Sequence, residues 1–273
     1  MKKIPCTVGI LTFNSGVTLR RALESVCSFD DIIICDGGST DETLAIASEF
    51  GCRVIPQDQQ YKNPDGSLRD YGGVRNQCLD AAKHDWFLYI DSDESISDGL
   101  CDDIRRIVTE PEYKLVYKVP IGIMMDGRYL KYSSNYPGYQ YRFFNRTSGA
   151  HFVKSVHERI EFDEANVSVG TLVHPWYVHT TREYWNQYLT ETGGYRPIEI
   201  AEACSGPFSP KGYFYYTVWW HLRASLAIFL KALRNYLLHG FADAVPVRGE
   251  LGRAAAPLLT IWKVTACRFA KLF

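Results

Sequence analysis

The fold is decided by the stretch Trp86-Phe-Leu-Tyr-Ile-Asp91-Ser-Asp93-Glu94, an apolar run that ends in three carboxylates within four positions. Its first part consists of large and β-branched residues and is typical of a buried strand. In α/β proteins the carboxyl ends of parallel strands open onto the ligand crevice, so we expect Asp91 and Asp93 to face a bound molecule. Clustered carboxylate oxygens suit Mg²⁺ or Mn²⁺, and either cation suits a diphosphate. The alternative interpretation is a solvated acidic turn.

Strand-like and helix-like segments alternate through the first half of the chain. Apolar runs at 7–13, 32–35, 53–56 and 86–90 are followed by helical patterns at 17–26, 43–50, 69–82 and 98–108. This alternation predicts an α/β fold with a mostly parallel, doubly wound sheet and right-handed crossovers.

The pattern changes in the second half, where short segments rich in Tyr, Phe and Val follow one another. They lie at 113–119, 128–132, 139–144 and 156–162. We expect them to add antiparallel strands to one side of the sheet. The turn-forming run Ser205-Gly-Pro-Phe-Ser-Pro210 then interrupts the chain. The predicted organisation is one domain over residues 1–205, with halves 1–111 and 112–205, and a tail over 206–273.

The composition predicts a globular protein with one sizeable core, because 46% of the 273 residues are apolar and 14% are aromatic. The first residues lack the pattern of a secretory leader, so we expect a cytoplasmic location. The eight cysteines show neither CxxC pairs nor zinc-ligand spacing. We therefore interpret them as reduced core residues.

Charge is divided unevenly along the chain. Residues 1–210 carry 21 Lys and Arg against 29 Asp and Glu, whereas residues 211–273 carry 9 against 2. A basic tail on an acidic body suggests that the tail meets an anionic surface. Nucleic acid and a phospholipid leaflet are the two candidates.

The apolar run 213–230 contains His221 and Arg223, which disfavours a membrane-spanning helix. Apolar side chains recur instead at steps of three and four and describe one helix face: Phe214, Val218, Leu222, Leu226, Phe229, Leu233 and Leu237. The segment 258–273 repeats this amphipathic, aromatic-rich pattern and favours the leaflet over nucleic acid. We expect peripheral attachment, through residues 211–273, to the anionic inner face of the cell membrane. The alternative is that these helices pack on the protein's own core.

The loop Asp36-Gly-Gly-Ser-Thr-Asp41 follows the strand-like run 32–35 and opens a helix. Glycines at such a turn let the backbone approach a ligand, and Asp36 at the strand end could accept hydrogen bonds from a base or a ribose. The chain has neither a GxxxxGK loop nor a GxGxxG fingerprint, so a P-loop NTPase and a dinucleotide oxidoreductase do not fit. The alternative is a capped turn with a solvated aspartate.

Four motifs in this order resemble the family 2 glycosyltransferases of the GT-A fold. They are Gly9-Ile-Leu-Thr-Phe-Asn14, Ile33-Ile-Cys-Asp36-Gly-Gly-Ser-Thr-Asp41, Gly73-Val-Arg75-Asn76 and Leu88-Tyr-Ile-Asp91-Ser-Asp93-Glu94. Two further segments, Tyr136-Pro-Gly-Tyr-Gln140-Tyr-Arg142 and Val156-His157-Glu158-Arg159, resemble the bacterial subgroup that includes lipopolysaccharide core glucosyltransferases. The resemblance covers roughly residues 5–195.

The resemblance implies a Rossmann-like nucleotide-diphospho-sugar transferase fold and a nucleotide-sugar donor. The residues implied at the donor are Thr12, Asn14, Asp36, Arg75, Asp91 and Ser92. Within this set Asp36 contacts the nucleoside, Arg75 the base or the diphosphate, and Asp91 the ribose. Asp93 is implied as the direct ligand of Mg²⁺ or Mn²⁺, with His179 completing the metal shell. His174 is the alternative to His179, and either could instead be a core histidine.

Sugar transfer requires an acceptor hydroxyl to lose its proton, so a carboxylate is needed opposite the leaving group. We expect Glu158 to be this general base, with Glu94 as the rival. A structural ion pair of Glu158 with Arg159 or Arg142 is the alternative. The resemblance further places Gln140, Arg142 and His157 on the acceptor side.

The predicted function is metal-dependent, inverting transfer of a sugar to a glycan or glycolipid, such as lipopolysaccharide core, at the cytoplasmic membrane face. A second hypothesis is transfer to polyprenyl phosphate, which needs no base because a phosphate is already ionised. A third is a catalytically silent membrane-binding module.

Overall fold

The computed structural model describes the chain except for residues 1, 111–113, 156–157, 184–195, 206–208 and 271–273. It divides into two compact units. We call residues 1–122 and 138–178 the sheet unit, and residues 123–137 and 179–273 the helical unit. This division differs from the boundary expected near residue 205.

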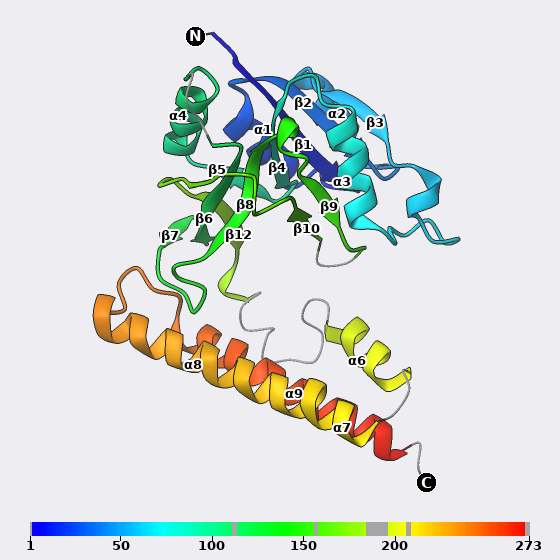
Figure 1. The fold of residues 1–273 in the computed structure, drawn as a ribbon, viewed down its shortest axis with the longest axis vertical. Coiled ribbons are helices and arrows are strands. Elements are labelled where there is room, and N and C mark those ends of the chain that lie inside the picture. The colour runs from blue at the N-terminus through cyan, green and yellow to red at the C-terminus, as the bar shows by residue number, and fades with distance from the viewer. Residues whose placement is uncertain (1, 111–113, 156–157, 184–195, 206–208, 271–273) are drawn as a thin grey trace. The chain divides into compact units, whose positions relative to one another are not determined.

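Parallel strands form the first half of the sheet unit, in the order β3-β2-β1-β4 (Figure 1). These strands are β1 (Ile4–Thr12), β2 (Phe29–Asp36), β3 (Arg53–Pro56) and β4 (Trp86–Asp91). The helices between and after them are α1 (Leu19–Val26), α2 (Thr43–Glu49), α3 (Tyr71–Asp80) and α4 (Asp98–Ile107), with a short 3₁₀ turn η1 (Gln59–Tyr61). The predicted βα alternation is therefore confirmed.

Side chains of successive strand residues enter two different cores. In β4, Leu88 packs with α1, α2 and α4 on one face of the sheet, whereas Phe87 and Tyr89 pack with α3 on the other. This follows from the two-residue period of a strand, and it makes the apolar run of β4 buried on both faces. The last residue of the run, Asp91, emerges only where the strand ends.

Antiparallel strands extend the sheet beyond β4 in the order β8-β6-β12-β5. They are β5 (Glu94–Ile96), β6 (Val116–Met125), β8 (Tyr139–Asn145) and β12 (Trp176–Thr180), while β11 (Val169–Thr171) pairs in parallel with β6. The strands β9 (His151–Val153) and β10 (Arg159–Glu161) form a separate ribbon, and a 3₁₀ turn, η2 (Arg146–Ser148), precedes it. The predicted antiparallel additions are confirmed, although β5, β9 and β11 were not anticipated.

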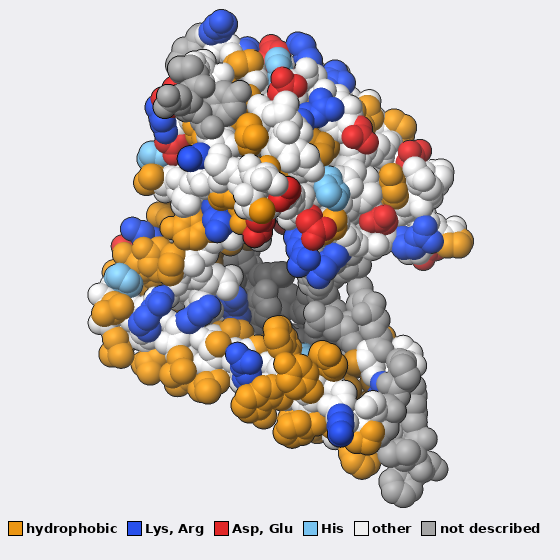
Figure 2. All heavy atoms as spheres, in the orientation of Figure 1, with side chains coloured by type: hydrophobic (Ala, Val, Ile, Leu, Met, Phe, Trp, Pro, Cys, Tyr) orange, Lys and Arg blue, Asp and Glu red, His pale blue; other side chains and the backbone are white. Residues whose placement is uncertain are grey.

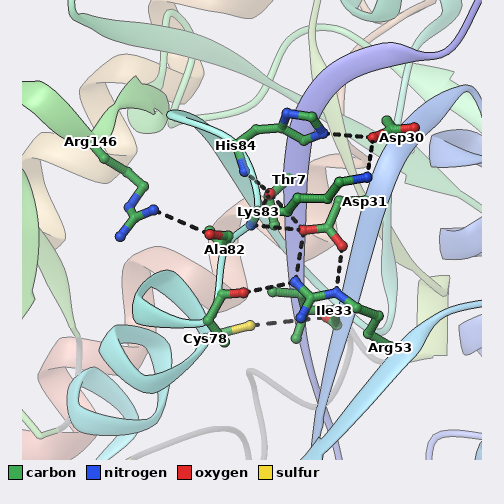
Figure 3. A network of polar contacts seen from close by, with 11 residues as sticks. Thr7, Asp30, Asp31, Ile33, Arg53, Cys78, Ala82, Lys83, His84 and Arg146 are labelled. Atoms are coloured by element: carbon green, nitrogen blue, oxygen red, sulfur yellow. Dashed lines mark hydrogen bonds and ion pairs between the residues drawn. The ribbon is translucent and has the colours of Figure 1, made fainter.

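A network of hydrogen bonds connects the amino-terminal parts of the parallel strands (Figure 3). Asp31 is only 4% exposed, and its carboxylate accepts hydrogen bonds from the guanidinium of Arg53 at 2.7 and 2.9 Å. The Thr7 hydroxyl donates to the same carboxylate at 2.7 Å and the Lys83 amide at 3.1 Å. Arg53 also donates to the Ala81 carbonyl at 2.7 Å. The network thereby holds the loop before β4 against β1, β2 and β3.

The helical unit contains α6 (Arg196–Ser205), α7 (Pro210–Gly212), a π-helical segment η3 (Tyr213–Trp219), α8 (Trp220–His239) and α9 (Val247–Ala270). Helices α8 and α9 run side by side, joined where the Ser225 hydroxyl donates to the Ala254 carbonyl at 2.6 Å (Figure 1). Within the described residues, none of the helices combines the length and the apolarity that crossing a membrane requires.

The hairpin around β7 (Arg128–Leu130) belongs to the helical unit because its continuation is bonded to α8 and α9. The Asn235 side chain donates to the Ser133 carbonyl at 2.6 Å, and Glu250 accepts from the Ser134 amide at 2.7 Å. These contacts join positions more than 100 residues apart, so no local pattern in the sequence marks them.

The expectation that all cysteines are reduced is wrong for one pair. A disulfide joins Cys204 in α6 to Cys267 in α9 across 63 residues of sequence. Cys6, Cys35 and Cys78 are free and buried, as expected. The pair was missed because its partners are brought together only by the packing of the two helices, which no short spacing reveals.

Candidate active site

Three of the predicted donor residues lie at neighbouring strand ends on one edge of the parallel sheet. Thr12, at the end of β1, pairs with Asp36, at the end of β2. Leu11 pairs on the other side with Asp91, at the end of β4. The register therefore gathers Thr12, Asp36 and Asp91 at the carboxyl edge of the sheet, where ligands bind in folds of this class.

Asp36 is almost fully buried, and both of its carboxylate oxygens are hydrogen bonded. The hydroxyl groups of Thr12 and Ser39 donate to one oxygen at 2.8 and 2.5 Å, and the amides of Gly38 and Ser39 donate to the other at 2.8 Å. Burial opposes ionisation, but these hydrogen bonds outweigh it and lower the pKa of Asp36. Gly38 has a φ of 100°, which glycine adopts without strain. Asp36 is thus a fixed, ionised acceptor, and its contact with a nucleoside stays a prediction.

Asn14 and Ser92 fasten loops to one another at this edge. Asn14 has a φ of 48°, and its side-chain oxygen accepts from the Thr40 amide at 2.9 Å. The Ser92 hydroxyl donates to the Ser15 hydroxyl across 2.9 Å, which ties the loop after β1 to the turn after β4. Both residues therefore fix loops at the carboxyl edge of the sheet, and their predicted donor contacts stay predictions.

Asp91 is linked to Glu158 through a buried arginine. The guanidinium of Arg75, on α3, is only 4% exposed and forms ion pairs with Asp91 and, through Nε at 2.6 Å, with Glu158. The ring centroids of Tyr89 and Phe152 lie 4.8 and 5.9 Å from the guanidinium carbon, close enough for cation–π attraction. Arg75, Asp91 and Glu158 were each predicted at the site, but their contact was not.

One guanidinium nitrogen of Arg75, Nη1, is buried and has no hydrogen-bond partner among the described residues. A buried donor left unpaired costs about 1–3 kcal/mol, so unpaired groups are rare and usually have a functional reason. Nη1 can therefore donate a hydrogen bond to a ligand, as can other buried atoms without a described partner, such as Ser134 Oγ and Trp176 Nε1.

Glu94 and Arg142 form a second buried ion pair beneath Asp91. Their guanidinium and carboxylate groups meet at 2.8 and 3.1 Å, and Glu94 also accepts from the Asp91 amide at 2.8 Å. Burial raises the pKa of Glu94 to about 7, although Arg142 opposes the shift. The guanidinium of Arg142 lies over the rings of Tyr89 and Trp176, at 4.5 and 3.8 Å. Glu94 and Arg142 thus bind mainly each other, and the alternative base role of Glu94 and the acceptor contact of Arg142 stay predictions.

Asp93 differs from Asp91 and Glu94 because its carboxylate forms no ion pair with a described residue and because it is exposed in the turn after β4. Partial burial and the nearby Asp91 carboxylate raise the pKa of Asp93. Within the described part of the chain, no three His, Cys, Asp or Glu side chains converge to hold a metal. Two adjacent carboxylates that repel each other nevertheless fit a divalent cation whose remaining ligands come from a diphosphate and water.

The predicted histidine ligand lies in β12. His179 follows Val178, which pairs with Glu94 of β5, and it belongs to the helical unit. Its role as a metal ligand stays a prediction. His174, the alternative, is half exposed and lies 2.9 Å from the Asp103 carboxylate of α4, which already occupies one ring nitrogen.

On the predicted acceptor side, Gln140 accepts a hydrogen bond from Arg142 at 3.0 Å and lines a pocket beside Glu158. His157 lies outside the described residues. The pocket has a volume of about 510 Å³ and is bounded by β8, β10 and the turn that follows β10.

Two residues at the crevice had no predicted role. Asp41 accepts from the Gly16 amide at 2.9 Å and so joins the loops after β1 and β2. The Lys62 ammonium donates to the Gly37 carbonyl at 2.7 Å, which places a positive charge beside the glycine turn. Asp41 could have been found as the last residue of the Asp36 motif, whereas Lys62 lies in a loop without any sequence signal.

Comparison with known proteins identifies the family. A family model described as Glycosyl transferase family 2 matches residues 7–166, which is more than half of the chain. The chain belongs to glycosyl transferase family 2. Together with the observed mixed sheet and its helices, this membership confirms the predicted GT-A fold. Membership in the lipopolysaccharide core subgroup stays a prediction.

Curated relatives match only part of the chain. An uncharacterized glycosyltransferase of Rickettsia prowazekii is 33% identical over 130 residues, which cover 46% of this chain and 41% of that protein. The glycosyltransferase SunS of Bacillus phage SPbeta is 26% identical over 157 residues, which cover 56% of this chain and 34% of that protein. The chain thus matches about two fifths or less of the length of these relatives.

Among solved structures, S. aureus TarS 1–349 in complex with UDP is 16% identical, with a TM-score of 0.47 over 100% of this chain and 91% of that chain. Glucosyl-3-phosphoglycerate synthase from Mycobacterium tuberculosis, in complex with Mn²⁺, UDP-glucose and phosphoglyceric acid, is 23% identical, with a TM-score of 0.34 over 42% of this chain and 43% of that chain. Similarity at this level transfers neither a ligand nor an activity to this chain.

Proposed function

We propose that the chain transfers a sugar from a nucleotide diphosphate sugar to an acceptor hydroxyl, with inversion at the anomeric carbon. Its family supports nucleotide-sugar chemistry. The observation that carries the proposal is the pair of contacts by which the buried Arg75 joins Asp91 to Glu158. It connects a carboxylate at the ligand edge of the sheet to a carboxylate that lines a separate pocket, as a reaction with two substrates requires.

In the proposed reaction the acceptor oxygen attacks the anomeric carbon while the bond from that carbon to the diphosphate oxygen breaks. The bonding electrons leave with the diphosphate, and the acceptor proton passes to Glu158. A carboxylate placed opposite the leaving group is what a single inverting displacement needs. Glu158 is 17% exposed at its side chain and lines the pocket, so an acceptor hydroxyl can reach it.

Arg75 positions this base. Its Nε holds one oxygen of Glu158 and leaves the other oxygen for the acceptor. Its fixed guanidinium geometry also orients Asp91, which shares the same arginine. The unpaired Nη1 is then available to an oxygen of the bound donor.

We further propose that Asp91 and Asp93 hold Mg²⁺ or Mn²⁺. Such a cation would neutralise charge that develops on the departing diphosphate. The position of both carboxylates in the turn at the end of β4 supports this assignment, and the carboxylate of Asp93 forms no ion pair with a described residue. Lys62 would add positive charge from the glycine turn after β2.

We also propose that the helical unit attaches the protein to an anionic membrane surface on the cytoplasmic side. Most of the predicted apolar face of η3 and α8 is exposed, with Phe214 at 60%, Leu226 at 58% and Leu237 at 76%. Trp220 and Trp262, at 61% and 62%, add aromatic side chains that favour an interface. Figure 2 shows such hydrophobic side chains interspersed with Lys and Arg on this unit. A glycolipid acceptor such as lipopolysaccharide core is consistent with this location.

The decisive experiment incubates the full chain with a panel of nucleotide diphosphate sugars, Mn²⁺ and a glycolipid acceptor. Released nucleoside diphosphate and the anomeric configuration of the product are measured. The proposal requires transfer with inverted configuration. Retained configuration would exclude Glu158 as the base, and donor binding without any transfer or hydrolysis would indicate a silent binding module.

Membrane attachment is tested by co-sedimentation of the full chain with vesicles of anionic or zwitterionic phospholipid. The variant pair Trp220→Ser and Leu226→Ser should reduce binding to anionic vesicles. Val173→Ser, at a 79% exposed position in the sheet unit, serves as the matched control and should have no effect. If the unaltered protein fails to sediment with anionic vesicles, the membrane proposal is wrong.

A further inference from the structure

The pocket beside Glu158 lies entirely within the sheet unit. Its volume of about 510 Å³ falls within the range of roughly 300–1,000 Å³ that is typical of small-molecule sites. That space accommodates a sugar unit. Because Glu158 forms part of the wall, a molecule in the pocket is in reach of the proposed base.

Aromatic side chains form one part of the wall. Tyr141 and Phe162 meet edge to face, with centroids 5.1 Å apart and planes at 90°. Tyr139 is 46% exposed at the rim. Rigid aromatic rings with a few polar groups beside them are the usual lining of a site that takes a small, partly apolar ligand. The C–H faces of a sugar ring provide such a surface.

The charged part of the wall is mainly acidic. Glu158, Glu161 and Glu164 line the pocket, and Arg159 is the one cationic residue among the lining residues that the structure describes. Arg159 lies 3.7 Å from Glu161 and is paired with it. Arg75 neutralises only part of the remaining charge, because it does not line the pocket and also balances Asp91.

We propose that this pocket binds the acceptor's terminal sugar as an uncharged unit and rejects one that carries a phosphate. This inference rests on the proposed sugar transfer. Carboxylates only accept hydrogen bonds, so Glu161 and Glu164 suit the hydroxyl groups of a neutral sugar. A phosphate offers further acceptors and like charge, and unfavourable charge pairs are an established means of excluding a ligand. Glu161 and Glu164 are thus specificity-determining residues, and the polyprenyl phosphate hypothesis is disfavoured.

The test compares matched probes on the full chain by ligand-observed NMR titration. The probes are methyl glycosides of common hexoses and the 6-phosphates of the same glycosides. We expect at least one neutral glycoside to bind, and its phosphate to bind at least about tenfold more weakly, a difference of about 1.4 kcal/mol. A phosphate that binds as tightly as its neutral counterpart overturns the proposal, and so does the absence of binding by every neutral glycoside.

Variants separate the role of the carboxylates from a general effect of charge. The double change Glu161→Gln and Glu164→Gln keeps hydrogen-bond acceptors but removes two charges. It should reduce the tenfold discrimination to about threefold or less, while binding of the neutral glycoside stays within a few-fold. Glu24→Gln is the control. Glu24 lies on the exposed side of α1, a helix that packs in the other hydrophobic core, away from the pocket. This change also replaces a carboxylate by an amide and should leave the affinity for both probes unaltered. Unchanged discrimination in the double variant overturns the assignment of these residues.

Calorimetric titration with nucleotide diphosphate sugars distinguishes failure of the specificity inference from failure of the proposed function. If donors bind and sugar is transferred but the probes show no preference, only the specificity inference is wrong. If no donor binds, the proposed function itself is wrong.

Discussion

Two networks of carboxylate and arginine lie at opposite ends of the parallel strands, and each has one buried charged member, Asp31 in the first and Arg75 in the second. At the amino ends, two hydrogen bonds join Asp31 to Arg53. The Thr7 hydroxyl and the Lys83 amide donate further hydrogen bonds to the Asp31 carboxylate. At the carboxyl ends, Arg75 serves two carboxylates and one of its nitrogens has no partner among the described residues. Both oxygens of the buried carboxylate in the first network accept hydrogen bonds, whereas the buried guanidinium in the second keeps one nitrogen without a described partner. The unpaired nitrogen of Arg75 is the feature on which we propose the second network, and not the first, as part of a ligand site.

Glu158→Gln is expected to have the largest effect on activity. The amide can still accept a hydrogen bond from Arg75 but cannot take a proton, so kcat should fall by roughly 10²–10⁴, the usual range for general-base catalysis. Donor affinity, measured by calorimetry, should stay unchanged. An unaltered kcat would return the base role to Glu94, and a parallel loss of donor binding would make Glu158 a structural residue.

Asp93→Ala should lower kcat by roughly 10²–10³, the range seen when one group that stabilises developing charge is removed. Because Asp93 forms no ion pair in the described protein, the melting temperature should hardly change. The measurement is donor binding with and without Mn²⁺: the metal-dependent part of the affinity should disappear. Activity within about tenfold of the unaltered protein, a barrier change of about 1.4 kcal/mol, contradicts the metal assignment.

Arg75→Lys and Arg53→Lys are a matched pair, because each keeps the charge and removes the guanidinium fork. At Arg75 the change should misplace Glu158 and Asp91 and reduce kcat/KM by about 10²-fold, as displacements of about 1 Å commonly do. At Arg53 kcat/KM should stay within about twofold, and only stability should fall. Equal losses of activity in the two variants would remove the distinction between the networks.

Asp31→Asn should lower the free energy of unfolding by about 1–3 kcal/mol without affecting kcat. The change removes the negative charge that pairs with Arg53 and replaces one buried hydrogen-bond acceptor by a donor. Urea denaturation measures this difference.

The loss of stability in Asp31→Asn should depend on pH. Although burial opposes it, hydrogen bonds from Arg53 and Thr7 lower the pKa of Asp31 in the folded protein. Such a group contributes stability above its unfolded pKa of about 3.9, and this contribution is lost as the pH falls through the lower folded value. The stability gap between unaltered protein and variant should therefore be constant from about pH 5 to 8 and shrink below about pH 4. A gap that persists at lower pH would assign the effect to packing.

Local patterns predicted the parallel strands, their order along the chain and the place of Asp36 and Asp91 at strand ends, because each feature lies within one βα unit. The contacts that define the candidate site were not predictable in this way. Arg75 and Glu158 are 83 residues apart, and Glu94 and Arg142 are 48 apart. Such pairs depend on the pairing of β8 with β4 and on the contact of the β9–β10 ribbon with α3, which hydrophobic periodicity does not encode. The short β5 was missed because it follows an acidic turn.

The hairpin around β7 ties the evolution of two separate segments of the helical unit together. The chain passes between the two units three times, at 122, 137 and 178, so the helical unit consists of an insertion and an extension. Expression of a fragment that ends near residue 205 would retain the insertion and discard α8 and α9. The Ser133 carbonyl and the Ser134 amide would then lose Asn235 and Glu250. The insertion 123–137 and the extension 179–273 are expected to be inherited together, since each supplies hydrogen-bond partners for buried polar groups of the other.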